Sequence, residues 1–304
     1  MKPAFSVIFL TTLIGAAQGL FLLLAGTQAA GLAEPAFLAL GGAVCVALSG
    51  LGLLASFFHL GHPERAWRAV AMWRTSWLSR EVIALPLFMA CVFFWAVSHA
   101  LGWPGSAAWA AAGALACVAL FVCTAMIYAS LRFLQEWASP LTLVNYVLLG
   151  CASGATLGAA LAALQAPALA PPYALLAIGL TLAGGVSRTL SLRRNARLRP
   201  RSTLQSAIGI RHPRIVQIAA GFLGGSFNTR EFFHGQPQAL MALVRNAFLV
   251  LVFVVPVLLL ALSINAPALL VLAFAVQYLG LLLERWFFFA QSSHPQNLYY
   301  QRTT

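Results

Sequence analysis

Two histidines, a glutamate and several arginines gather where a long apolar stretch of the sequence ends. They lie in FFHLGHPERAWRA, residues 57–69, and in the polar start of the next apolar run. A neutral imidazole and a carboxylate at one membrane edge can hydrogen-bond a carbonyl group and relay protons. His59 and Glu81 are therefore candidates for a proton-handling site. Arg65 and Arg80 add cations that could stabilise a developing anion or bind a lipid phosphate.

The same residues also have a structural interpretation. Ser79 is a plausible N-cap for the helix that follows, and Glu81 in its first turn would favour the positive end of the helix dipole. His59 could lie among lipid headgroups. The spacing of these residues leaves both interpretations open.

Composition indicates the elements that position these groups. The chain has 304 residues, of which 61% are hydrophobic and 8% charged, with a mean hydropathy of +0.88. This is too little charge for the surface of an ordinary soluble protein. A spanning helix needs about 20 mostly apolar residues, and the sequence contains eight such runs. We expect them at 5–25, 35–60, 79–101, 107–133, 140–164, 171–192, 241–263 and 267–290.

The expected fold is all-α, a single transmembrane domain over 1–304 in which eight helices form a bundle. A basic loop at about 193–240 is its only long polar segment. Lys and Arg fall at the ends that alternate helices bring to one side, so the positive-inside rule predicts that both termini and this loop are cytoplasmic. The net charge of +12 is distributed as membrane-flanking charge, which indicates anionic lipid as a partner and not nucleic acid.

Other kinds of site find little support in the sequence. No HExxH, GxSxG, Walker or dinucleotide-binding motif is present. Of the six histidines, only His59 and His99 are placed near spans, and they are expected at opposite faces, so no haem is predicted. The five cysteines lie inside spans without CxxC spacing and are interpreted as packing residues. Glycines four residues apart at 15, 19, 150, 154 and 158 predict close helix packing.

Three segments of the sequence carry a resemblance to a known family. HLGHPERAWRA followed by RTSWLSREV resembles the membrane-edge segment of anchor subunits of the dimethyl sulfoxide reductase family, which have eight spans and react with quinone without haem. The resemblance implies roles in quinol binding for His59 and Glu81. LLLERWFFF likewise resembles a family position at which an acid, here Glu284, closes the last span.

The resemblance also implies partners and a location. Such anchors hold a molybdopterin catalytic subunit and an iron-sulfur subunit at the bacterial cytoplasmic (inner) membrane. They are not catalytic for the oxidised or reduced substrate, but pass electrons between the iron-sulfur subunit and ubiquinone or menaquinone. A quinone between the second and third spans would then exchange protons through His59 and Glu81. Arginines of the basic loop could dock the iron-sulfur subunit, although charge retention explains them equally well; these are Arg193, Arg194, Arg197, Arg199, Arg201, Arg211, Arg214 and Arg230.

The predicted cytoplasmic edge suits the branch of this family that anchors cytoplasmic sulfite dehydrogenases. PAFSVIFLTTLIGAAQG and SFNTREFFHG are similar to those anchors as well. We therefore expect sulfite oxidation with quinone reduction. Two alternatives are a menaquinol-oxidising anchor of a dimethyl sulfoxide reductase-type complex and an anchor of the polysulfide reductase type. A third is a stand-alone secondary transporter in which Gln18, Asn145 and Gln277 line a path, although no internal repeat is detectable.

Overall fold

The computed structural model describes residues 1–304 except 59, 217, 219–231, 233, 264–265 and 301–304, and it does not describe the side chains of 299 and 300. The secondary structure of the described residues is helical, with no strand among them. Eight helical segments within this part of the chain are long and apolar enough to cross a membrane. The all-α prediction and all eight predicted spans are confirmed.

Seven spans are continuous helices and one is interrupted. The spans are α1 (Phe5–Ala29), α2 (Pro35–Phe57), α3 (Trp77–Leu101), α4 (Ser106–Ala129), α5 (Pro140–Gln165), α6 (Ala170–Ala196, preceded by η2, Pro167–Leu169), the α9–η3–α10 segment and α11 (Ala268–Ala290). The interrupted segment comprises α9 (Gln238–Leu249), the π-helical η3 (Val250–Val254) and α10 (Val255–Leu262). Helices suit this composition because they satisfy every backbone hydrogen bond within the segment.

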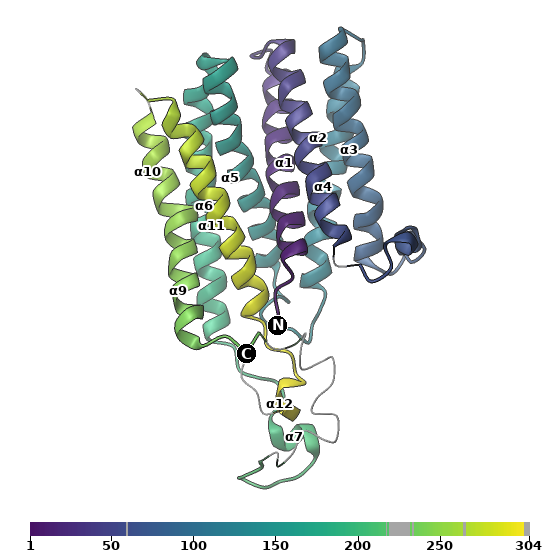
Figure 1. The fold of residues 1–304 in the computed structure, drawn as a ribbon, viewed down its shortest axis with the longest axis vertical. Coiled ribbons are helices and arrows are strands. Elements are labelled where there is room, and N and C mark those ends of the chain that lie inside the picture. Colours follow the sequence, from purple (N-terminus) through teal and green to yellow (C-terminus); the bar gives the residue numbers. More distant parts are fainter. Residues whose placement is uncertain (59, 217, 219–231, 233, 264–265, 301–304) are drawn as a thin grey trace.

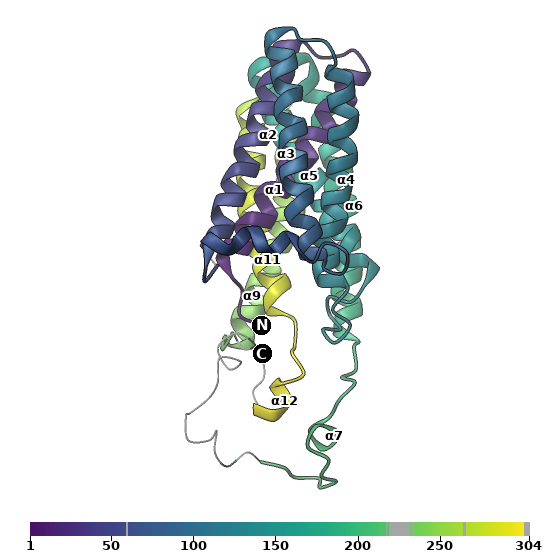
Figure 2. The same ribbon diagram turned by 90° about the vertical axis from the view of Figure 1, so that its right-hand side faces the viewer.

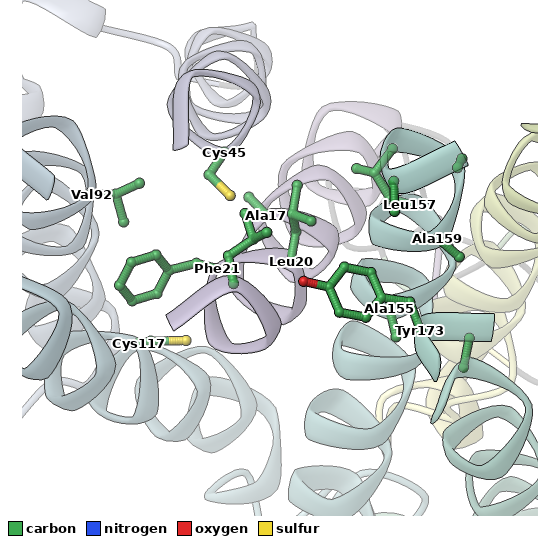
Figure 3. Packing of buried hydrophobic residues seen from close by; sticks show 14 of the residues in the cluster. Ala17, Leu20, Phe21, Cys45, Val92, Cys117, Ala155, Leu157, Ala159 and Tyr173 are labelled. Carbon is green, nitrogen blue, oxygen red and sulfur yellow. The ribbon is translucent and has the colours of Figure 1, made fainter. Parts of the chain in front are cut away.

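Helix α1 runs through the middle of the bundle. It packs along α2 on one side and α5 on the other, and it also contacts α4 and α11 (Figure 1). The ring of Phe21 on α1 lies 5.6 Å from that of Phe88 and 5.3 Å from that of Trp95, centroid to centroid. Cys45 and Cys117 lie on either side of Phe21 (Figure 3). All five cysteines are free, as expected of packing residues.

Glycines allow α1 and α5 to approach closely. A Cβ on Gly19 would lie 2.7 Å from the Cα of Cys151, and a Cβ on Gly150 would lie 3.0 Å from the carbonyl oxygen of Gly15. Ordinary side chains cannot occupy such positions without moving the backbone of the neighbouring helix. The packing role predicted from the four-residue spacing is confirmed for these glycines.

One end of the bundle, which we call the basic end, is where α1, α3, α5 and α9 begin and α2, α4, α6 and α11 finish. The amino group of Met1 donates a hydrogen bond of 2.8 Å to the carbonyl oxygen of Ser292, just after α11. The short helices α7 (Leu204–Ile208) and α12 (Asn297–Tyr300) lie beyond this end (Figures 1 and 2). The 3₁₀ helix η1 (Pro63–Val70) connects α2 to α3 at the same level (Figure 2).

Candidate functional site

Glu81 lies inside the bundle and not in the first turn of its helix. Helix α3 begins at Trp77, and its N-cap is Ser76, whose hydroxyl accepts a hydrogen bond from the backbone N–H of Ser79. The expectation that Ser79 is the N-cap is therefore wrong. Glu81, the fifth residue of α3, is 9% exposed, and the hydroxyl of Thr124 on α4 donates a hydrogen bond of 2.5 Å to its Oε1. A carboxyl group held this way faces a neighbouring helix, so a simple helix-dipole role does not account for its position.

A small cavity adjoins Glu81, with polar and apolar side chains in its lining. Its volume is about 20 Å³, which is room for about one water molecule. The polar side chains that line it come from α1, α3, α4, α5 and α11; they are Thr11, Thr12, Gln18, Glu81, Thr124, Tyr146, Ser153 and Arg285. Helix α2 contributes no residue to this lining, although the sequence predicted a site between the second and third spans. The cavity therefore brings together groups that can donate, accept or exchange a proton, within a largely apolar bundle.

A buried ionic group lies beside the cavity. The Nε of Arg188 on α6 is 2.7 Å from Oε1 of Glu284 on α11, and Nη2 of Arg285 is 3.7 Å from Oε2 of the same glutamate. Arg188 and Glu284 are each 1% exposed, and Arg285 is 4% exposed. Charges at membrane depth are costly and are usually paired. With two arginines and one glutamate, the group keeps one positive charge in excess, and its Arg285 lines the cavity.

Aromatic rings hold the guanidinium of Arg285 in place. Its central carbon lies 3.9 Å from the ring centroid of Tyr146 and 5.3 Å from that of Phe288. Tyr146 in turn stacks on Tyr128, with centroids 5.9 Å apart and an interplanar angle of 15°. A cation over aromatic faces is stabilised by the quadrupole of the rings. The guanidinium is thus fixed against the wall of the cavity.

The predicted site residues are only partly brought together. Glu81 lines the cavity, whereas Glu284 lies behind Arg285 and does not. His59 lies outside the described residues. Arg65 is exposed, with its Nε 3.6 Å from Oε1 of Glu64.

Arg80 stabilises the connection between α2 and α3. It donates hydrogen bonds to the carbonyl oxygens of Trp73, at 2.9 Å, and Arg74, at 2.7 Å, and its guanidinium lies 4.2 Å from the ring centroid of Trp77. Neither Arg65 nor Arg80 lines the cavity. These contacts give Arg80 a structural role in this connection, and its role at a quinone site stays a prediction.

The predicted docking arginines are mostly exposed at the basic end. Arg194 differs from the others, because it is half-buried and its guanidinium donates to the carbonyl oxygens of Gln135, at 3.0 Å, and Ala138, at 3.3 Å. Arg230 lies outside the described residues. Those with exposed side chains are Arg193, Arg197, Arg199, Arg201, Arg211 and Arg214. They form a cationic surface on and after the last turn of α6.

Seven residues of the site were not identified from the sequence: Thr11, Thr12, Thr124, Tyr146, Ser153, Arg188 and Arg285. Arg188 and Arg285 were interpreted only as charges near helix ends. Among the described residues, no three His, Cys, Asp or Glu side chains are grouped so that they could hold a metal ion. The absence of haem stays a prediction.

Comparison with known proteins gives two consistent matches. The family described as DMSO reductase anchor subunit (DmsC) matches residues 1–291. A sulfite dehydrogenase subunit from Allochromatium vinosum is 54% identical over 322 aligned positions, which cover 99% of each chain. The family match includes all eight spans and every residue that lines the cavity. The chain belongs to the family of DMSO reductase anchor subunits, and it is a multi-span membrane protein.

Proposed function

We propose that this chain is the quinone-reactive anchor of a molybdopterin and iron-sulfur oxidoreductase complex in the bacterial inner membrane. The family supports the anchor role. The observation that carries the quinone role is Glu81, a buried carboxyl group hydrogen-bonded to Thr124 at a cavity that other polar side chains also line. Glu81 lies about 6 Å along α3 from the start of the helix. A proton-exchanging group at this depth is close to the aqueous phase at the basic end, where the partner subunits would dock.

The proposed reaction is sulfite oxidation coupled to quinone reduction. It is supported by the relative that is 54% identical over 99% of both chains and is named as a subunit of sulfite dehydrogenase. Sulfite would be oxidised in the molybdopterin subunit, and the iron-sulfur subunit would pass the two electrons to this chain's quinone site. The exposed arginines after α6 offer a cationic surface to that subunit.

The donor set around the cavity fits the chemistry of a quinone, which takes up two electrons and two protons when it is reduced. Glu81 can give or take a proton, and the Tyr146 hydroxyl and Arg285 guanidinium can donate hydrogen bonds to an oxygen atom. The volume of about 20 Å³ admits one oxygen atom but no ring. In this proposal the ring therefore lies outside the cavity and Glu81 exchanges protons through it.

The orientation predicted by the positive-inside rule adds an energetic consequence. If the basic end faces the cytoplasm, both electrons and protons reach the quinone from that side. Turnover would then move no net charge across the bilayer. Sulfite-driven quinone reduction in proteoliposomes should accordingly generate no membrane potential in a voltage-sensitive dye assay.

The test is to purify the complex through a tagged anchor and to assay sulfite oxidation with two electron acceptors. Decylubiquinone requires the anchor, whereas ferricyanide can take electrons from the soluble subunits. Glu81→Gln should lower quinone turnover by about 100-fold, within the usual contribution of a positioned acid or base, and leave ferricyanide turnover unchanged. Glu64→Gln is the matched control, since Glu64 is an exposed carboxylate in the α2–α3 connection.

Two outcomes would contradict the proposal. Equal quinone turnover in wild type and Glu81→Gln would remove Glu81 from the reaction. A tagged anchor that elutes without molybdenum and iron, under conditions that preserve other membrane complexes, would contradict the anchor role in this organism's membranes and favour a stand-alone transporter.

A further inference from the structure

We propose that Arg285 and Tyr146 form a binding site for one electron-rich oxygen atom on the cavity wall, and that Arg188 and Glu284 are positioning residues for Arg285. The inference rests on the proposed function and deepens it. The oxygen would be a quinone carbonyl oxygen, which gains negative charge as the quinone is reduced. Glu81 would exchange the proton, and Arg285 would stabilise the charge.

Unfilled hydrogen-bonding groups are the first evidence for this site. The Nε of Arg285 and the hydroxyl of Tyr146 are both buried. The two side chains interact with each other, but neither of these atoms has a hydrogen bond of good geometry within the described part of the chain. Both residues line the cavity. A guanidinium group has five N–H donors, and a buried donor without an acceptor destabilises the fold. A cavity with room for one oxygen atom beside these donors is the expected geometry of a binding site for an acceptor.

The charge of the ionic group is the second line of evidence. Glu284 approaches Arg188 to 2.7 Å but Arg285 only to 3.7 Å, so its negative charge is directed mainly to Arg188. Arg285 is the less neutralised of the two cations, and it is the one at the cavity. A fixed cation in a water-poor site stabilises negative charge that develops during a reaction, because it needs no reorganisation at that moment.

The same geometry gives Arg188 a specific task. Arg188 does not line the cavity, and it is held at 1% exposure with its guanidinium 5.5 Å from the ring centroid of Phe248. By pairing with Glu284, it restrains that carboxylate from closing on Arg285. Without Arg188, Glu284 could pair closely with Arg285 and neutralise it. Arg188 would thus act on the reaction through Glu284, at a distance from the cavity.

The first experiment compares conservative variants with decylubiquinone and ferricyanide as acceptors. Arg285→Gln should lower quinone turnover by about 100-fold, as expected for the loss of a donor to a developing anion, and Arg285→Lys should recover part of it. Tyr146→Phe keeps the ring under Arg285 and should raise the KM for decylubiquinone or lower kcat several-fold. Tyr173→Phe is the matched control, because it removes a buried hydroxyl that bonds Thr27 far from the cavity.

The second experiment tests the positioning role by charge. Arg188→Gln should lower quinone turnover about tenfold, because Glu284 then neutralises Arg285. The double variant Arg188→Gln/Glu284→Gln restores the free charge of Arg285 and should regain activity over the single variant. A purely structural role predicts the reverse order, since the double variant loses more contacts.

The outcomes separate this inference from the proposed function. Wild-type quinone kinetics in Arg285→Gln, with Glu81→Gln impaired, would overturn the inference alone, whereas wild-type kinetics in both variants would overturn the proposed function as well. If the arginine variants fail to assemble, Tyr146→Phe decides, because it removes a single oxygen atom. Unchanged KM and kcat in Tyr146→Phe would then overturn the inference.

Discussion

Replacing Gly154 by alanine should destabilise the bundle by forcing α1 and α5 apart. A Cβ at this position would lie 2.5 Å from the Cα of Gly19 and closer still to the backbone nitrogen of Leu20. Real Cβ contacts are essentially never shorter than 3.0 Å, and here the obstacle is backbone, which cannot rotate away. Overpacking of this kind costs about 1–3 kcal/mol, and the better helix propensity of alanine returns about 1 kcal/mol. The net loss of stability is the overpacking cost minus the gain in helix propensity. Because the obstacle is backbone, we expect this loss to lie near its upper limit, about 2 kcal/mol.

Thermal unfolding of the purified protein in detergent measures this effect, with Gly179→Ala as the matched control. Gly179 is also within a spanning helix, but a Cβ there would have no heavy atom within 4 Å. The same change should therefore lower the midpoint at Gly154 and leave it equal or raised at Gly179. Equal midpoints for the two variants would refute the close approach of α1 and α5. Because both helices line the cavity, Gly154→Ala should also reduce quinone turnover.

Three further substitutions test other parts of the molecule. Thr124→Val removes the hydroxyl that donates to Glu81 and should lower quinone turnover several-fold without affecting assembly, as measured by the molybdenum content of the purified complex. Burial raises the pKa of Glu136 above its usual 4.5. The folded state therefore holds this proton more tightly, and stability falls as the pH rises from about 4.5 through the raised pKa. Glu136→Gln should abolish that fall in thermal midpoints measured from about pH 4 to about pH 8. Arg194→Gln removes two hydrogen bonds to the α4–α5 connection and should cost about 1–3 kcal/mol in unfolding free energy. A pure docking residue would change only binding of the partner subunits.

The spans were predictable because hydropathy alone decides them. A run of about 20 apolar residues has few alternatives to a spanning helix, and the observed spans have mean hydropathies between 1.6 and 2.5. The glycine contacts were predictable for a related reason, since a four-residue period places small residues on one helical face. The start of α3 was less accurately predicted. Thr75, Ser76 and Ser79 all precede Glu81 near the start of α3, and the sequence does not indicate which of them caps the helix.

The surroundings of Glu81 could not be predicted in the same way. Glu81 was identified as a carboxylate close to His59 at the membrane edge, but its hydrogen-bond donor comes from α4, and other cavity residues come from α5 and α11. Helices that are apolar on all sides carry no stripe that fixes their rotation toward neighbours. The sequence therefore suggested His59, at the end of the second span, as the partner of Glu81, whereas the cavity beside Glu81 lies toward α1.

The depth of a charged residue along its helix gives information that the charge pattern alone does not. Arg188 is eight residues before the end of α6 and Glu284 six before the end of α11, about 12 Å and about 9 Å from the basic end. An arginine near a helix end is commonly interpreted as flanking charge, but one this deep needs a partner of opposite charge. With only six acids in the chain, all of them glutamates, Glu284 is the one at matching depth on a helix that ends at the same side. The same count places Glu81 and Arg285 about 6 Å and about 8 Å from that end. The two groups proposed to exchange the proton and to stabilise the charge thus lie at one level of the membrane, as a single oxygen atom between them requires.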